Sequence, residues 1–245
     1  MALKKQDLCI DIHSHILPGV DDGSKDMEQT MEMLKTAWNE GITHIVATPH
    51  YKHGRRNISP EDSMDLVQGV QAIANSKGIP ITIYKGNEIF YFSGATEKLD
   101  ESRISTMNNT DYVLVEFLPT ESFSYIRNAF DQLIGMGYRP IIAHIERYSC
   151  MLKNKDYAQE LHNMGVKIQV NADSIMGKFG FQLKMYTRAL LKYELIDYIG
   201  TDAHNHDKRN PKMKDCRDFI YKKCSEDYAD AILFKNAIDD FELEL

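Results

Sequence analysis

The feature that most constrains the fold of this sequence is a regular alternation of short β-rich runs with segments of helical pattern. Seven runs occur, at residues 8–15, 44–50, 81–89, 112–117, 140–145, 167–171 and 198–201. Because helix-length segments separate them, the runs predict repeated β-α units and a parallel sheet.

The first helix has the clearest signals. Asp26 is placed to cap it with Gln29 three residues later, and Gly41 is placed to end it. An apolar stripe follows helical spacing between them, made of Met27, Met31, Leu34 and Trp38. Further helices are predicted near residues 60–77, 122–136, 154–164, 180–193, 211–224 and 226–240.

A parallel sheet whose strands are all followed by helices either closes as a barrel or stays open and doubly wound. Residues 17–23 after the first run read Leu-Pro-Gly-Val-Asp-Asp-Gly, which is no glycine-rich phosphate loop. This favours the barrel over a nucleotide-binding fold. Since we find no internal repeat or long linker, a single domain over residues 1–245 is the simplest division.

Composition excludes several classes of protein. The net charge of −7 argues against a general nucleic-acid binder. None of the four cysteines is followed six positions later by arginine, as a cysteine-dependent tyrosine phosphatase requires, so structural thiols are expected. The N-terminal segment has no apolar stretch of signal-peptide length, and no segment approaches a membrane span. We therefore expect a soluble, cytoplasmic protein.

Polar side chains that bind metals lie at or just past the ends of the predicted strands. They are His13, His15, His50, Glu88, Glu116, His144, Asp202 and His204, and the loop after the first run adds Asp21 and Asp22. Five of the nine histidines are in this group, although chance would scatter them. The carboxyl edge of a parallel sheet is where barrels and open α/β folds build their active sites.

The residue types favour a transition-metal site. In an extended strand His13 and His15 project to one side, and Asp202 and His204 do likewise. Imidazole with carboxylate suits zinc, iron or manganese better than calcium. A buried carboxylate such as Glu88 is costly unless it is paired or bound to a metal. The alternatives are a loop-capping role for His50, a core role for His144 and a supporting role for Asp11.

The sequence resembles the polymerase and histidinol phosphatase (PHP) family of metal-dependent phosphoesterases. It is most similar to the bacterial tyrosine phosphatases of capsule and exopolysaccharide gene clusters, the CpsB and YwqE type. The matching stretches are residues 11–23, 47–50, 86–88, 143–148 and 200–204, which span nearly the whole chain in family order.

The resemblance implies an α/β fold, a distorted (β/α)7 TIM-like barrel called the PHP fold, with three divalent metal ions. Manganese is expected first, although the same ligands accept iron, zinc or magnesium. The implied ligands are His13, His15, Glu88 and Asp202 for one ion; Glu88, Glu116 and His144 for a second; and Asp22, His50 and His204 for the third. Asp22 is chosen over Asp21 because it matches the family position.

The resemblance also implies the reaction. A metal-bound hydroxide would hydrolyse phosphotyrosine, and Arg147 and Arg209 would bind the phosphate. The implied substrate is the tyrosine-rich tail of a bacterial tyrosine kinase that regulates capsule or exopolysaccharide synthesis, with no nucleic-acid partner and no membrane insertion. Two alternatives remain: a small-molecule phosphatase such as a histidinol phosphatase, and a catalytically silent metal-bound scaffold.

Other cationic groups are assigned to the surface. Lys52, His53, Arg55 and Arg56 are expected in a solvated loop that could form a positive rim, and His206 is expected to be a surface histidine. The general acid for the leaving group is not identified.

Overall fold

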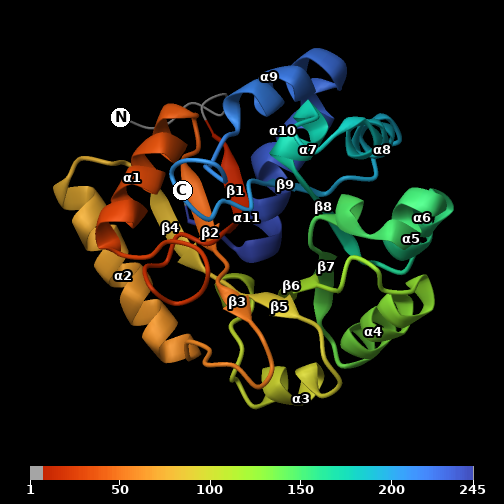
Figure 1. The fold of residues 1–245 in the computed structure, drawn as a ribbon, viewed down its shortest axis with the longest axis horizontal. Helices are drawn as coiled ribbons and strands as arrows, with labels where there is room; N and C mark the ends of the chain where they lie inside the picture. The colour runs from red at the N-terminus through yellow and green to blue at the C-terminus, as the bar shows by residue number, and fades with distance from the viewer. Residues whose placement is uncertain (1–7, 245) are drawn as a thin grey trace.

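A computed structural model of the chain describes residues 8–244, so the segment 1–7, predicted to carry no signal peptide, lies outside it. Its strands form two parallel sheets surrounded by helices (Figure 1). One sheet has the order β1 (Ile10–Ser14), β2 (His44–Ala47), β4 (Thr82–Lys85). The other has the order β3 (His50–Tyr51), β5 (Glu88–Phe90), β6 (Tyr112–Glu116), β7 (Arg139–Ile142), β8 (Lys167–Asn171), β9 (Tyr198–Gly200).

The last strand returns to the first, which closes the ring of strands. The backbone N–H of Asp202 donates to the carbonyl oxygen of His13 at 2.7 Å, and that of His15 donates to Ala203 at 2.8 Å. Gly200 permits this approach, because a Cβ there would stand only 2.7 Å from the Cβ of His13. The predicted α/β distorted barrel is thereby confirmed.

The described part of the chain has nine strands instead of seven because two predicted runs are broken. Run 44–50 divides at residues 48–49 into β2 and β3, and run 81–89 divides at residues 86–87 into β4 and β5. The two breaks lie side by side, since the Asn87 side chain and the Glu88 N–H both donate to the carbonyl oxygen of Pro49. Both strands thus cross from one sheet to the other, and His50 comes into register with Glu88.

The predicted helices are present with boundaries within a few residues. They are α1 (Met27–Asn39), α2 (Pro60–Ser76), α4 (Phe123–Gly135), α6 (Asp156–Asn163), α8 (Phe181–Lys192) and α9 (Lys214–Lys223). The expected segment 226–240 comprises α10 (Glu226–Asp230), a π-helical turn η4 (Ala231–Lys235) and α11 (Asn236–Phe241). Asp26 caps α1 as predicted, by accepting from the Gln29 N–H at 2.8 Å. Met31 and Leu34 are buried, whereas Trp38 is 37% exposed.

Five short helices were not predicted. They are α3 (Ala95–Asp100), η2 (Met107–Asn109), η3 (Ile145–Arg147), α5 (Ser149–Lys153) and α7 (Ala172–Met176). Each spans fewer than two turns, too short to show an apolar period. A turn at residues 143–144 and the helix η3 replace the end of the predicted run 140–145, so β7 stops at Ile142.

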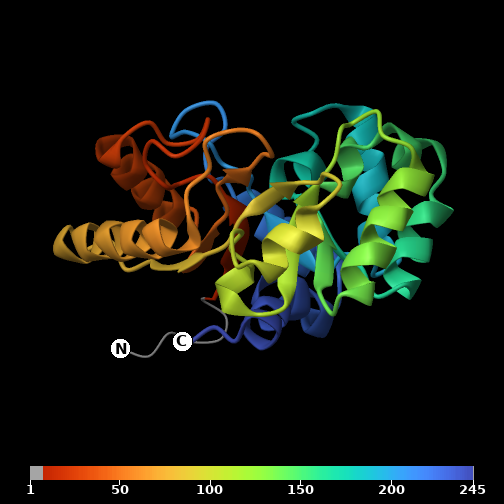
Figure 2. The ribbon, with the colours of Figure 1, turned by 90° about the horizontal axis from the view of Figure 1, so that it is seen from below.

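The loops that follow the strands gather on one side of the barrel (Figure 2). All five residues of β1 are buried, as expected for a parallel strand covered on both faces. No helix in residues 8–244 is long and apolar enough to cross a membrane.

Candidate metal centre

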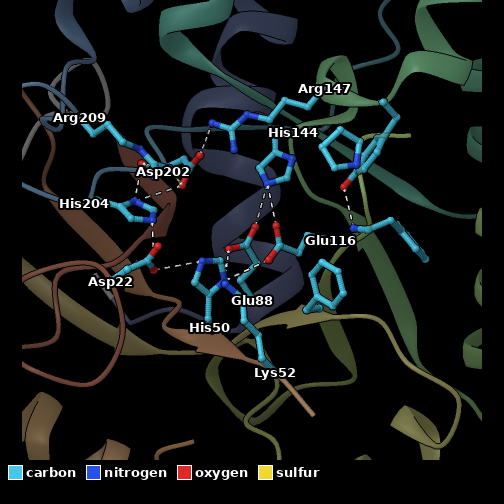
Figure 3. Close-up of a pocket in the computed structure, with 14 residues that line it drawn as sticks. Asp22, His50, Lys52, Glu88, Glu116, His144, Arg147, Asp202, His204 and Arg209 are labelled. Carbon is cyan, nitrogen blue, oxygen red and sulfur yellow. Dashed lines mark hydrogen bonds and ion pairs between the residues drawn. The ribbon is translucent and has the colours of Figure 1, made fainter. Parts of the chain in front are cut away.

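The fold brings all nine predicted metal ligands to the loop side of the barrel. His13 is in β1 and His15 follows it; His50, Glu88 and Glu116 lie in β3, β5 and β6; His144 follows β7; Asp202 and His204 follow β9; Asp22 is in the loop before α1. Six of these side chains surround the cavity drawn in Figure 3 together with Asp22. The predicted set is therefore one spatial cluster.

His13 and His15 present the same ring nitrogen to one point. Their Nε2 atoms are 3.3 Å apart, so at most one could donate a proton to the other. The opposite ring nitrogens are engaged elsewhere: Nδ1 of His13 lies 3.2 Å from Gln169 Oε1, and Nδ1 of His15 lies 2.7 Å from Asp21 Oδ2. An imidazole held at Nδ1 with a free Nε2 is the usual form of a metal-binding histidine.

Glu88 stands at the middle of the cluster and is 1% exposed. Its Oε1 lies 3.2 Å from Nε2 of His13 and 2.9 Å from Nε2 of His144. Its Oε2 lies 3.3 Å from Nε2 of His15 and 2.9 Å from Nδ1 of His50. This buried carboxylate faces four imidazoles through both oxygens and belongs to two of the groups that could hold a metal ion.

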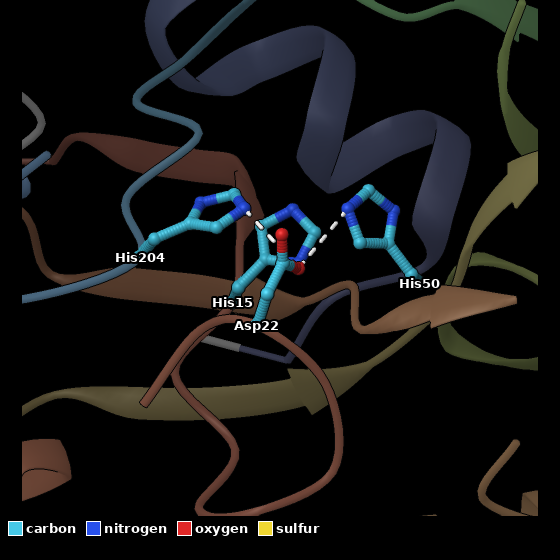
Figure 4. A group of neighbouring side chains, drawn as sticks. All are labelled: His15, Asp22, His50 and His204. Atoms are coloured by element: carbon cyan, nitrogen blue, oxygen red, sulfur yellow. Dashed lines mark ion pairs between the residues drawn. The ribbon is translucent and has the colours of Figure 1, made fainter. Parts of the chain in front are cut away.

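A further group of possible ligands lies toward the solvent. His15, Asp22, His50 and His204 bring one ligand atom each within 4.8 Å of one another, with Asp22 between two of the rings (Figure 4). The Oδ1 atom of Asp22 is 3.4 Å from His50 Nε2 and 3.7 Å from His204 Nε2. The Asp22 side chain is 65% exposed, so this group is the most open part of the centre.

Two details differ from the predicted division of ligands among the three ions. His50 joins Glu88 and Glu116 through Nδ1, at 3.2 Å from Glu116 Oε1, as well as facing Asp22 through Nε2. His15 belongs to the outer group as well as to the pair with His13. His50 stands between neighbouring groups because the broken strand sets it directly beside Glu88.

The charge states of the centre are mixed. Burial opposes protonation of His13, His15 and His50, but the neighbouring carboxylates raise the pKa of all three. A bound cation would therefore have to displace their protons.

The carboxylates and His204 are in forms that suit cation binding. Burial alone would raise the pKa of Glu88, but the neighbouring imidazoles, His13 foremost, hold it well below the ordinary value. Burial likewise opposes ionisation of Asp202, but His13, His15 and Arg147 keep its pKa well below the ordinary value. Burial and the adjacent His15 lower the pKa of His204 to about 3. Ionised carboxylates and a neutral imidazole are the forms that bind metals.

The two predicted phosphate-binding arginines meet at Asp202. Nη2 of Arg147 donates to Oδ2 of Asp202, and Nη2 of Arg209 donates to Oδ1 at 2.8 Å (Figure 3). Arg147 comes from η3, directly after His144, and Arg209 comes from the loop after β9. Both line the same cavity of about 250 Å³ as seven of the nine candidate ligands.

Two site residues adopt backbone conformations that are rare for side chains other than glycine. His144 has φ of 33° and Asp202 has φ of 53°. Each is fixed by a hydrogen bond from its own N–H, to Gln169 Oε1 at 2.7 Å and to the carbonyl oxygen of His13 at 2.7 Å. Such strained positions concentrate at functional sites, where the surroundings hold them.

Three positioning residues complete the centre. Gln169, in β8, was not predicted; its only sequence signal is a polar residue between Ile168 and Val170 in an apolar run. Asp21 proves to be a loop acceptor that binds the N–H groups of Gly23 and His50 besides the His15 ring. Asp11 does not hold an imidazole ring. Its carboxylate accepts hydrogen bonds from the N–H and hydroxyl of Thr201 and from the backbone N–H of His13.

The basic residues of the loop after β3 differ in whether they reach the cavity. Lys52 lines the cavity, which was not expected. His53, Arg55 and Arg56 are exposed and do not line it. Phe90, Phe117, Pro119 and Tyr148 line the cavity as well, and none of them was singled out in the sequence.

Fold and site together define a metallohydrolase built on a distorted α/β barrel. Barrels of this kind occur among solved structures of low identity: an organophosphorus hydrolase from Deinococcus radiodurans aligns with a TM-score of 0.64 at 13% identity, covering 95% of this chain and 92% of that one. At this identity the likeness concerns the fold alone.

Sequence comparison identifies the family. Residues 9–241 match the family described as "Capsular polysaccharide synthesis, CpsB/CapC". The tyrosine-protein phosphatase CpsB of Streptococcus pneumoniae is 34% identical over 220 residues, covering 87% of this chain and 90% of the relative. The tyrosine-protein phosphatase YwqE of Bacillus subtilis is 33% identical over 201 residues, covering 82% of this chain and 79% of the relative.

A solved structure agrees with the sequence match. It comes from work on YwqE and CpsB described as "unique metal-dependent tyrosine phosphatases", and it aligns with a TM-score of 0.87 at 30% identity. The alignment covers 96% of this chain and 95% of that one. The chain belongs to the CpsB/CapC family of metal-dependent tyrosine phosphatases.

Proposed function

We propose that this chain hydrolyses phosphotyrosine in proteins with the help of three divalent metal ions. The observation that carries the proposal is the meeting of two guanidinium groups, from Arg147 and Arg209, with the cluster around Glu88 in one cavity. The two together suit hydrolysis of a phosphoryl dianion, because arginine binds its oxygens and metal ions activate the attacking water. The activity named for the CpsB and YwqE relatives supports the choice of phosphotyrosine.

We propose the ligand division that the family resemblance implies, with His15 and His50 each also facing a neighbouring group. His13, His15, Glu88 and Asp202 would hold one ion; Glu88, Glu116 and His144 a second; and Asp22, His50 and His204 the third. Bound ions would supply an acidified water and neutralise phosphoryl charge. The facing Nε2 atoms and the central carboxylate fit such ions. We propose manganese first, and the mixed ligands also suit iron, zinc or magnesium.

The arginines are placed to bind and orient the phosphoryl group. Both donate to Asp202 and line the cavity, so each guanidinium group is held at the cavity wall. Phosphate oxygens would take up the donors that Asp202 does not use, in the two-pronged geometry that favours arginine over lysine. The departing phenolate has an ordinary pKa of about 10, so it depends less on a proton donor than an alkoxide does.

The proposed physiological substrate is the phosphorylated, tyrosine-rich tail of a bacterial tyrosine kinase. An anionic tail suits a cavity whose mouth carries Lys52 and two arginines, although the whole chain has a net charge of −7. The family description ties its members to capsular polysaccharide synthesis. We propose that this chain regulates capsule or exopolysaccharide synthesis by that dephosphorylation, in the cytoplasm.

The test is phosphate release from a phosphotyrosyl peptide before chelation, after chelation and after reloading with manganese. We expect chelation to abolish turnover and manganese to restore it. Histidinol phosphate is assayed in parallel, and a strong preference for it would overturn the choice of substrate. Metal-loaded protein that releases phosphate from no ester would contradict the enzymatic proposal and indicate a scaffold.

A further inference from the structure

The cavity of the metal centre has two chemically different sides. Arg147 and Arg209 lie with Asp202 on one side, and Lys52 lies across from them (Figure 3). Phe90, Phe117 and Pro119 contribute apolar surface to the same cavity. Its volume of about 250 Å³ is below that of a typical drug-sized pocket, so it admits one compact group at a time. The proposed function places the phosphoryl group on the polar side and gives the apolar side no role.

The strand register explains why Phe90 reaches this cavity. Successive side chains of a strand alternate faces, so Phe90 projects on the same side of β5 as Glu88. Phe90 is in register with Glu116 of β6 and lies nearer the loop side than Glu88. Lys52 follows directly after β3, the strand that pairs with β5, and lines the same cavity. Phe90 and Lys52 therefore reach the same cavity from two neighbouring segments of the chain.

The ring of Phe90 is less tightly packed than the ring of Phe117 in the same cavity. Phe117 is 3% exposed and packs edge-on against Phe130, with ring centroids 5.3 Å apart, and against Tyr148 at 6.0 Å. Phe90 is only half-buried, and within residues 8–244 it takes part in no ring–ring contact. A half-buried ring that borders a cavity and lacks an aromatic neighbour offers one face to a ligand.

We propose that Phe90, with the aliphatic stem of Lys52, forms an aryl subsite that holds the ring of the substrate while Arg147 and Arg209 hold its phosphate. The inference rests on the proposed phosphatase function, and it assigns the selection of aryl over alkyl phosphate esters to Phe90. Aromatic rings in contact gain from offset or edge-to-face packing beyond simple burial. An alkyl ester such as phosphoserine has no ring to place there.

The test compares Phe90→Ala, Phe90→Leu and Phe90→Trp with the wild type, on matched phosphotyrosyl and phosphoseryl peptides and on phenyl and ethyl phosphate. We expect Phe90→Ala to lower kcat/KM for the aryl esters by about three- to tenfold and Phe90→Trp to retain it. The alkyl esters should change little. Phe92→Ala is the matched control, because Phe92 stacks on His53 at 4.6 Å and does not line the cavity.

A binding measurement separates this inference from the proposed function. Phenylphosphonate and methylphosphonate cannot be hydrolysed, and their dissociation constants from the manganese-loaded protein are measured by calorimetry. Phe90→Ala should weaken the binding of phenylphosphonate and leave that of methylphosphonate unchanged. Equal weakening of both, or of neither, would overturn the aryl subsite. If the wild type hydrolyses no ester, the proposed function fails while the phosphonate pair still decides the role of Phe90.

Discussion

The amide oxygen of Gln169 lies 3.2 Å from Nδ1 of His13, and the same oxygen accepts the backbone N–H of His144 at 2.7 Å. One side chain of β8 therefore fixes two ligands that come from β1 and from the turn after β7. Its amide nitrogen donates to Asn171 Oδ1 at 2.8 Å, which determines which way the amide faces. Strand β8 contributes no metal ligand of its own, but it orients those of its neighbours.

Replacing Gln169 with Leu should weaken metal binding without unfolding the protein. Outer hydrogen-bond partners of metal ligands typically contribute about 10- to 100-fold in affinity, and the substitution removes the partner of His13. Manganese titration by calorimetry measures the effect. Gln159→Leu is the control, since Gln159 is exposed and bonds only to Asn163 in α6. Equal manganese affinity in the two variants would show that Gln169 does not position His13.

Sequence reasoning could bring the candidate ligands together because all but Asp22 lie near the end of a β-rich run or just after it. Asp22 was chosen from the family resemblance. Gln169 has no such signal, since its role depends on an oxygen shared by His13 and the turned backbone of His144. That turn requires φ of 33° at a histidine, which no residue pattern announces. The barrel class was predictable from the alternation of strands and helices.

The crossing of two strands between sheets was not predicted. Proline lacks an N–H for a sheet ladder, so Pro49 is a signal for the break in run 44–50 that could have been used. The crowding at Gly86, where a Cβ would stand 2.9 Å from the sulfur of Met107, is visible only in three dimensions. The double contact of His50 with Glu88 and Asp22 follows from this crossing.

His13→Ala and Arg147→Ala should have separable effects. His13→Ala removes a ligand from the middle of the cluster, so metal content and activity should fall together. Arg147→Ala should keep the metal, because Arg209 still bonds to Asp202, and should weaken inhibition by inorganic phosphate roughly 10- to 100-fold. Elemental analysis and phosphate inhibition constants decide this, and loss of metal in the arginine variant would contradict the assignment.

Lys52→Gln should raise KM for phosphotyrosyl peptides a few-fold, with a larger effect at low ionic strength. Lys52 lines the cavity that is proposed to bind the phosphate, and attraction between its charge and an anion is screened by salt. Arg56→Gln is the matched control: it removes a cation of the same loop that does not line the cavity. Similar KM values for the two variants at every salt concentration would assign the effect to the loop's charge in general.

Alkylation should not inactivate the protein. Burial raises the pKa of Cys9 to about 12, and burial raises that of Cys216 further. Burial also raises the pKa of Cys150 and of Cys224, both half-buried. The thiolate is the reactive form, so iodoacetamide at neutral pH should modify the native protein slowly and spare its activity. Rapid inactivation that follows labelling of one thiol, seen by mass spectrometry, would point to an essential cysteine.

His44 should make the fold sensitive to mild acid. It lies in β2, 3% exposed, with Nδ1 2.8 Å from the Thr43 hydroxyl, and burial lowers its pKa below the ordinary 6.5. Between that lowered pKa and about 6.5, the unfolded chain binds a proton that folded His44 does not. The free energy of unfolding must therefore fall, through this residue, as pH drops from about 7 through that range.

A His44→Gln variant should lose this part of the acid sensitivity, because glutamine does not titrate and can still hydrogen-bond to Thr43. The measurement is urea unfolding of both proteins between about pH 5 and 8 in the presence of chelator, so that metal binding does not vary with pH. The ligand histidines titrate in both proteins and cancel in the difference. We expect the wild type to lose more stability than the variant below about pH 6.5, and parallel curves would show that His44 is protonated as readily in the folded state as in the unfolded chain.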